Sequence, residues 1–92
     1  NLRTPYGEID LIASQGFTIV FIEVKTRTDY SYGYPEEAIN QEKREHLLQS
    51  AQAYLNEQPD QKGDWRIDVI AIKGNPAQGE SEIYHFENIL SE

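Results

Sequence analysis

Apolar residues follow a strand-like pattern near the start of the chain. Residues 7–13 and 18–26 are rich in β-branched and aromatic side chains, so each segment predicts a β-strand. Residues 14–17, which include Gly16, predict the hairpin link between them. Because both strands carry apolar residues on both faces, we expect central strands that helices cover.

The spacing of apolar residues becomes helical after Asn40. From residue 41 to about residue 57 they recur at positions 47, 48, 51, 54 and 55, which predicts an amphipathic helix. Asn40 is a suitable N-cap, and Pro59 follows the expected end of the helix. Residues 29–35 predict a loop by their Gly, Pro and Ser content, and residues 38–39 predict either a short turn of helix or a lead-in to the helix.

A strand pattern returns in the last third of the chain. Residues 65–73 predict a third strand, residues 74–81 a turn region, and residues 82–86 a shorter fourth strand. A chain of 92 residues is long enough for one domain, 1–92. Three or four strands with one long helix predict an α/β or α+β fold.

The charge balance changes the picture of possible partners. The chain has 8 Lys and Arg residues against 16 Asp and Glu residues, a formal net charge of −8, and the excess acid lies in residues 31–92. This balance argues against tight electrostatic binding to nucleic acid. It does not exclude such binding, because carboxylates that hold divalent cations also count as negative.

The residue types that the chain lacks limit its expected cellular compartment and the kinds of catalytic or metal site that it can form. The chain has no Cys, which excludes disulfides, thiol catalysis and zinc–thiolate sites and fits a reducing cytoplasm. No apolar run approaches the ~18–20 residues that cross a bilayer, so we expect no membrane partner. The chain also has no Met and begins with Asn1, so we expect a front-truncated or processed piece.

Three ionisable residues in the two N-terminal strands carry the candidate chemistry. Glu23 and Lys25 project from one face of their strand about 7 Å apart, among apolar residues that make their burial costly. Asp10 lies on the same face if the hairpin loop has an even number of residues. An odd loop or a bulge places Asp10 on the opposite face, and the link 14–17 leaves both outcomes open.

If the hairpin loop has an even number of residues, these three residues predict a site for a hard divalent cation. Asp10, Glu23 and also Glu8 would supply oxygen ligands, which suit Mg²⁺ or Mn²⁺. Such a cation polarises a phosphodiester oxygen and lowers the pKa of a bound water, while Lys25 either orients that water or stabilises the negative charge that develops on the phosphate. A buried ion pair without chemistry is the alternative. The chain has no HExxH motif or phosphate-binding glycine loop that competes with this hypothesis.

A longer string of residues resembles a known family. It consists of Asn1-x-Arg3, Gly7-Glu8-Ile9-Asp10-Leu11-Ile12-Ala13, Phe21-Ile22-Glu23-Val24-Lys25-Thr26-Arg27, Gly33-x-Pro35, a helix with Lys43, and Arg66-Ile67-Asp68-Val69. In this order and spacing the string is similar to the YraN-like proteins, which are uncharacterised bacterial proteins. They are placed in the PD-(D/E)XK nuclease superfamily, with relatives among Holliday-junction resolvases.

The resemblance implies a fold and an activity. It implies a restriction-endonuclease-like α/β domain, a mixed β-sheet flanked by helices, from which the family's N-terminal helix is missing here. By resemblance, Asp10 and Glu23 would bind Mg²⁺ or Mn²⁺, Lys25 would be catalytic, and Glu8 would be an accessory acid. The superfamily's endonucleases hydrolyse phosphodiester bonds, and because its resolvases act on branched DNA, the resemblance implies DNA, including branched DNA, as a substrate more than RNA.

Several other residues are either candidate nucleic-acid contacts or ordinary surface and packing residues. Lys43 falls on the Leu47 side of its helix, so its amine either reaches the strand ends and a bound phosphate or lies along the surface. Arg3 and Arg27 are candidate phosphate contacts or ordinary surface residues. The tyrosines at positions 30, 32 and 34 form a stacking strip for bases or pack on the domain.

Asp68 and the two histidines are expected to be mainly structural. Asp68 is expected to pair with Arg66 or Arg3, with a role in the site as the second choice. His46 and His85 have no metal-ligand partner at a useful spacing and are expected to be ordinary.

Two other classes of function stay open. One is a non-catalytic module that retains the nuclease fold and binds nucleic acid or a protein, which the acid excess favours. The other is a structural or protein-interaction domain whose acidic residues form a solvated face. A homodimer is also compatible with the uncovered edges of a small sheet.

Overall fold

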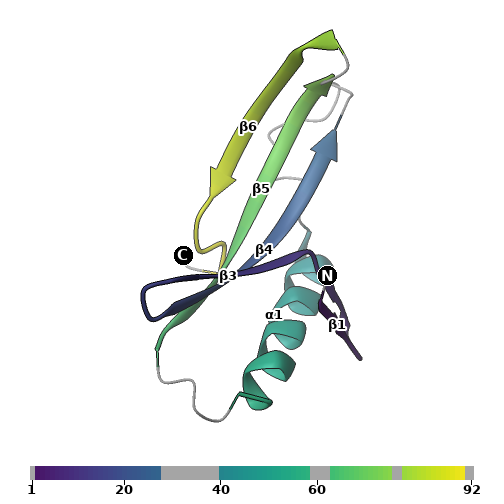
Figure 1. The fold of residues 1–92 in the computed structure, drawn as a ribbon. Coiled ribbons are helices and arrows are strands. Elements are labelled where there is room, and N and C mark those ends of the chain that lie inside the picture. The colour runs from purple at the N-terminus through teal and green to yellow at the C-terminus, as the bar shows by residue number, and fades with distance from the viewer. Residues whose placement is uncertain (1, 28–39, 59–62, 76–77, 91–92) are drawn as a thin grey trace.

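The computed structural model describes residues 2–27, 40–58, 63–75 and 78–90 (Figure 1). Its elements are, in chain order, β1 (Leu2–Thr4), β2 (Gly7–Ile9), β3 (Leu11–Gln15), β4 (Thr18–Arg27), α1 (Gln41–Asn56), β5 (Trp65–Asn75) and β6 (Glu80–Phe86). The expected loop 29–35, the tyrosines within it and the lead-in 38–39 lie outside the described residues.

Four strands form one mixed sheet in the order β3-β4-β5-β6. β4 pairs antiparallel with β3 and parallel with β5, and β5 pairs antiparallel with β6. The parallel pair is joined through α1, as parallel neighbours require a long crossover (Figure 1). The expectation of a mixed α/β domain is therefore confirmed at the level of the sheet and its helix.

The predicted strand 7–13 is wrong as a single element. The chain bends at Asp10, and the part before the bend, β2, pairs with β1 in a separate two-stranded sheet. Only the part after the bend, β3, joins the main sheet. The physical reason is a side-chain contact, because the Asp10 carboxylate accepts a hydrogen bond from the Val24 N–H of β4 in place of a further ladder pair.

The hairpin between β3 and β4 has a two-residue loop, Gly16 and Phe17. Gln15 pairs with Thr18, and Gly16 adopts a φ of 63°, which suits a tight hairpin turn. The loop is therefore even in length, which is the parity that the sequence left open. β5 and β6 are also longer than expected, since Asn75 pairs with Glu80 inside the predicted turn region.

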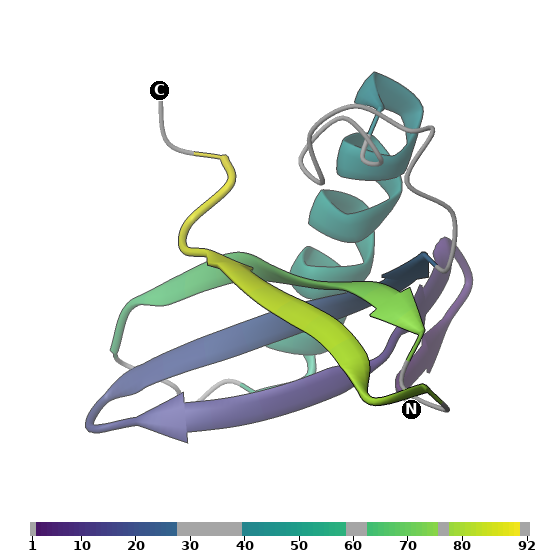
Figure 2. The same ribbon diagram turned by 90° about the horizontal axis from the view of Figure 1, so that it is seen from above.

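The helix α1 lies across one face of the sheet, as the turned view shows (Figure 2). Its N-cap is Asn40, as predicted, whose side-chain oxygen accepts a hydrogen bond of 2.8 Å from the Lys43 N–H. The core between helix and sheet is a cluster of fully buried apolar residues: Ile9, Phe21, Leu47, Ala51 and Ile67. Phe21 also makes edge-to-face contacts with Tyr54 and Trp65.

The opposite face of the sheet has no helix among the described residues. Leu11 is 53% exposed and Ile83 is 69% exposed there. The expectation that helices cover both N-terminal strands is therefore wrong for β3, which is an edge strand, whereas β4 is central.

After β6 the chain returns to the sheet, where the Ile89 N–H donates to the Ile67 carbonyl at 2.8 Å. Ile89 and Leu90 then pack against the core cluster.

Candidate functional site

Glu23 and Lys25 lie on the helix-covered face of β4, because strand alternation places them on the same side as the core residue Phe21. Glu23 is only 5% exposed. The Lys25 Nζ lies 3.4 Å from the Glu23 Oε1. The sequence expectation that these two residues share a face is confirmed.

Asp10 lies beside the same strand. Leu11 pairs with Ile22, so one further ladder pair would set Asp10 opposite Glu23 and on the same side of the sheet. The chain bends there instead of adding another ladder pair, and the Asp10 Oδ2 accepts a hydrogen bond of 2.9 Å from the Val24 N–H. The Asp10 carboxylate therefore replaces the missing backbone partner at the residue that follows Glu23.

Lys43 joins this group from the first turn of α1. Its Nζ lies 3.3 Å from the Glu23 Oε1, the oxygen that Lys25 also approaches. Lys43 lies one helical turn before Leu47, so its side chain faces the sheet, as the spacing predicted. The packing of α1 on the sheet thus brings Lys43 to Glu23 across 20 residues of sequence.

The second carboxylate oxygen of Glu23 has no such partner. The Glu23 Oε2 is buried and makes no hydrogen bond with any of the described residues. A buried acceptor without a donor costs roughly 1–3 kcal/mol, and more when it is charged. The group is therefore asymmetric, with two ammonium groups on one oxygen and a bare oxygen beside them.

Glu8 and Arg3 do not join this group. They face each other across β1 and β2, where the Arg3 Nε lies 2.9 Å from the Glu8 Oε1. No set of three or more His, Cys, Asp or Glu residues gathers around a possible metal position within the part of the chain that the structure describes. The described residues therefore bring together two of the two or three expected carboxylates, and the role of Glu8, which lies on the separate ribbon, as an accessory acid stays a prediction. Arg27 ends β4, and its side chain lies outside the described residues.

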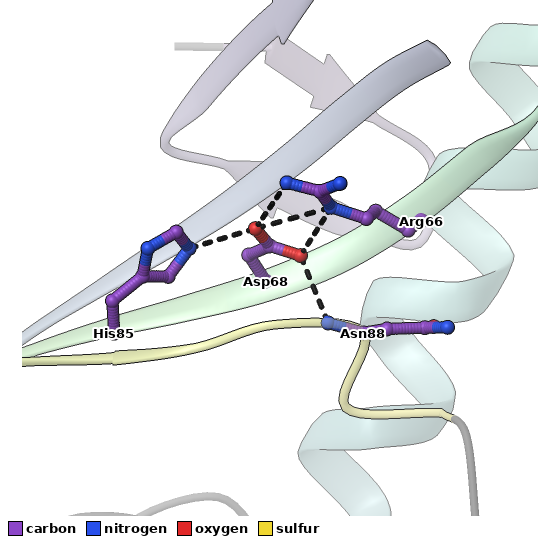
Figure 3. Close-up of polar contacts among 4 residues, drawn as sticks. All are labelled: Arg66, Asp68, His85 and Asn88. Atoms are coloured by element: carbon purple, nitrogen blue, oxygen red, sulfur yellow. Dashed lines mark hydrogen bonds and ion pairs between the residues drawn. The ribbon is translucent and has the colours of Figure 1, made fainter. Parts of the chain in front are cut away.

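A second polar cluster lies on the other face of the sheet, around Asp68 (Figure 3). Asp68 is fully buried and accepts hydrogen bonds from three directions. The Arg66 Nε lies 3.0 Å from Oδ1, the His85 Nε2 lies 2.8 Å from Oδ2, and the Asn88 N–H donates to Oδ1 at 2.9 Å. Pairing of Asp68 with Arg66 was expected and is confirmed, whereas Arg3 binds Glu8 instead.

The partners of Asp68 decide its charge. Burial raises the pKa of the Asp68 carboxyl, but the hydrogen bonds from Asn88, His85 and Arg66 lower it by more, so its pKa lies below the ordinary value. His85 was expected to be ordinary and is instead a partner of this buried carboxylate. This contact depends on the β5–β6 register, which pairs Ile70 with His85 and so places the His85 ring on the same face as Asp68.

Comparison with known proteins places the chain in a family. Residues 1–72 match the model of the uncharacterised protein family UPF0102. The chain belongs to this family. The resemblance to the YraN-like proteins is thereby confirmed, since these are the members of UPF0102.

Similar UPF0102 proteins come from several bacteria. A UPF0102 protein of Syntrophotalea carbinolica is 42% identical over 86 residues, which are 94% of this chain and 68% of that protein. One of a Sulfurihydrogenibium species is 41% identical over 91 residues, which are 99% of this chain and 74% of that protein. One of Chlorobium phaeobacteroides is 47% identical over 72 residues, which are 78% of this chain and 57% of that protein.

The described residues of this UPF0102 chain also bear on the membrane expectation. Among them, no helix has the length and apolar character that crossing a bilayer requires.

Proposed function

We propose that this UPF0102 chain is a metal-dependent nuclease-type domain that hydrolyses phosphodiester bonds in DNA. The observation that carries the proposal is the bare, buried Oε2 of Glu23 beside two lysines. A carboxylate in that position is costly in a protein that uses it only as an ion pair. Its retention is explained if the bare oxygen has a cation as its partner.

The residues present fit a hard divalent cation such as Mg²⁺ or Mn²⁺. Glu23 offers the unpartnered Oε2, and Asp10 offers its second oxygen, Oδ1, while its Oδ2 accepts the Val24 N–H. Both are oxygen donors of the kind that these ions prefer, and Mg²⁺ is commonly held by one or two carboxylates and several waters. Two carboxylates are therefore enough without Glu8.

The bound cation would polarise the phosphodiester and lower the pKa of an attacking water. The chain's own residues do the rest. Asp10, fixed by the Val24 N–H, holds its carboxylate just before the start of β3, beside the residue that follows Glu23. Lys25, whose side chain is 21% exposed, lies where it can orient the water or stabilise negative charge on the phosphate.

Calorimetric titration with Mn²⁺ tests the metal site. We expect binding heat in the unmodified chain and its loss in Asp10→Asn and in Glu23→Gln. Glu45→Gln removes the same charge from an exposed position of α1 and is the matched control. Absence of heat in the unmodified chain, or equal heat in all three variants, contradicts the proposal.

Cleavage assays test the activity. Supercoiled, branched and single-stranded DNA incubated with Mg²⁺ or Mn²⁺ should be cut by the unmodified chain and left intact by Lys25→Ala. Cutting that persists in Lys25→Ala at the same level would identify a contaminating nuclease.

A second candidate is a binding module that retains the fold without catalysis. It is favoured by the absence of a third carboxylate near Asp10 and Glu23 among the described residues, together with the net charge of −8. A gel shift with DNA and no product after long incubation with Mn²⁺ would support this candidate over the enzyme.

A further inference from the structure

The lysines around Glu23 are not equivalent. Lys25 belongs to the same strand as Glu23 and its side chain is 21% exposed, whereas Lys43 comes from α1 and its side chain is 34% exposed. Both ammonium groups approach the same oxygen, Oε1, so their positive charges also repel each other. Lys43 is the one that can leave more easily, because more of its side chain is exposed and it belongs to another element than Glu23.

We propose that Lys43 is an exchangeable counter-ion for Glu23. In the metal-free chain its ammonium neutralises the buried carboxylate, and a divalent cation that binds Glu23 displaces it. The freed ammonium then binds a phosphate group of the nucleic acid. This inference rests on the proposed metal site and adds a coupling between the metal and the substrate.

The local charge supports the coupling. Asp10 and Glu23 carry two negative charges, and Lys25 and Lys43 carry two positive charges, so the group is balanced without a cation. A divalent cation makes the group positive and creates a local anion site in a chain whose formal net charge is −8. Phosphate contacts need such positive charge, so we expect DNA affinity to depend on the metal.

The first experiment compares Mn²⁺ affinity by calorimetry in the unmodified chain, Lys43→Met and Lys43→Arg. Lys43→Met keeps the apolar stem and removes the competing charge, so it should bind Mn²⁺ more tightly, by roughly three- to tenfold. Lys43→Arg should bind as the unmodified chain does. Arg44→Met removes a positive charge at the neighbouring position of α1, and it should leave the affinity unchanged.

The second experiment measures DNA affinity by fluorescence anisotropy, with a labelled duplex whose phosphorothioate linkages resist cutting. In the unmodified chain, Mn²⁺ should tighten DNA binding relative to EDTA. In Lys43→Met that gain should be largely lost although the metal binds better. Opposite changes in the two affinities cannot arise from a partly unfolded variant, which would lose both.

Each outcome separates the two proposals. If the unmodified chain binds no Mn²⁺, the proposed function fails and this inference fails with it. If the unmodified chain binds Mn²⁺ but Lys43→Met binds it equally or more weakly, only the exchange is overturned. If Lys43→Met keeps the full metal-dependent gain in DNA affinity, Lys43 is not the phosphate ligand.

Discussion

The buried carboxylate of Asp68 supports a quantitative prediction about stability. In Asp68→Asn the side chain keeps its size but loses its charge, and its amide group now faces donors from Arg66 and His85. Hydrogen bonds to a charged group contribute about 1.5–3 kcal/mol each. The Arg66 and His85 side chains are 23% and 45% exposed, so water replaces part of what they lose.

The loss of stability should therefore come mainly from the buried Asp68 side chain and less from its partly exposed partners. We expect Asp68→Asn to lower the free energy of unfolding by about 2–3 kcal/mol, less than the cost of stripping a fully enclosed charge pair. For a domain of this size, that corresponds to a fall in the melting temperature of about 10–20 °C. Urea unfolding followed by circular dichroism measures the free energy, and a thermal scan measures the melting temperature.

The same substitution should change the pH dependence. The pKa of Asp68 is lowered in the folded chain, so its stabilisation is present above the unfolded pKa of about 3.9 and is lost as the pH falls through the folded pKa. The stability difference between the unmodified chain and Asp68→Asn should therefore be constant near neutral pH and shrink below about pH 4.

Asp64→Asn is the control for both measurements, because Asp64 is an exposed residue next to the start of β5. It should change stability by less than about 0.5 kcal/mol. The reasoning is refuted if Asp68→Asn unfolds at the same urea concentration as the unmodified chain. It is also refuted if the stability difference grows as the pH falls.

Three further substitutions test the fold, each by urea unfolding. Asn40→Ala removes the N-cap of α1 and should cost about 1 kcal/mol, whereas Asn40→Ser should restore most of it. Gly63→Ala should cost about 2 kcal/mol or more, because an ideal Cβ there would lie 1.7 Å from the Phe17 carbonyl oxygen; a cost near zero would contradict this close approach. Ala51→Leu should cost about 1–3 kcal/mol because Ala51 is fully buried against the sheet, and an unchanged midpoint would show that the core has spare room.

The helix and its inward face could be predicted because their signals are local. Asn40 caps the helix through its own side chain, and Leu47 and Ala51 follow the helical period that buries them. The same period indicated that Lys43 faces the sheet. Only one boundary differs, since the helix ends at Asn56, one residue before the expected end.

The N-terminal strand was harder to predict because the local composition and a tertiary contact have opposite effects at Asp10. Residues 7–13 have a continuous strand composition, which favours one element. The bend at Asp10 is stabilised by its carboxylate accepting the Val24 N–H, a contact 14 residues away that no local pattern reveals. The break divides the segment between two sheets, and it separates Glu8 from Glu23.

Local patterns were enough to predict the mixture of strands and helix and the shared face of Glu23 and Lys25, because side-chain alternation within a strand is a local property of the backbone. The contacts of Lys43 with Glu23 and of His85 with Asp68 arise only when the chain is folded. Those contacts join elements that are distant in sequence, so they depend on how α1 packs on the sheet and on the register of β5 with β6. The bare oxygen of Glu23 follows from that packing alone, since burial is a property of the assembled core.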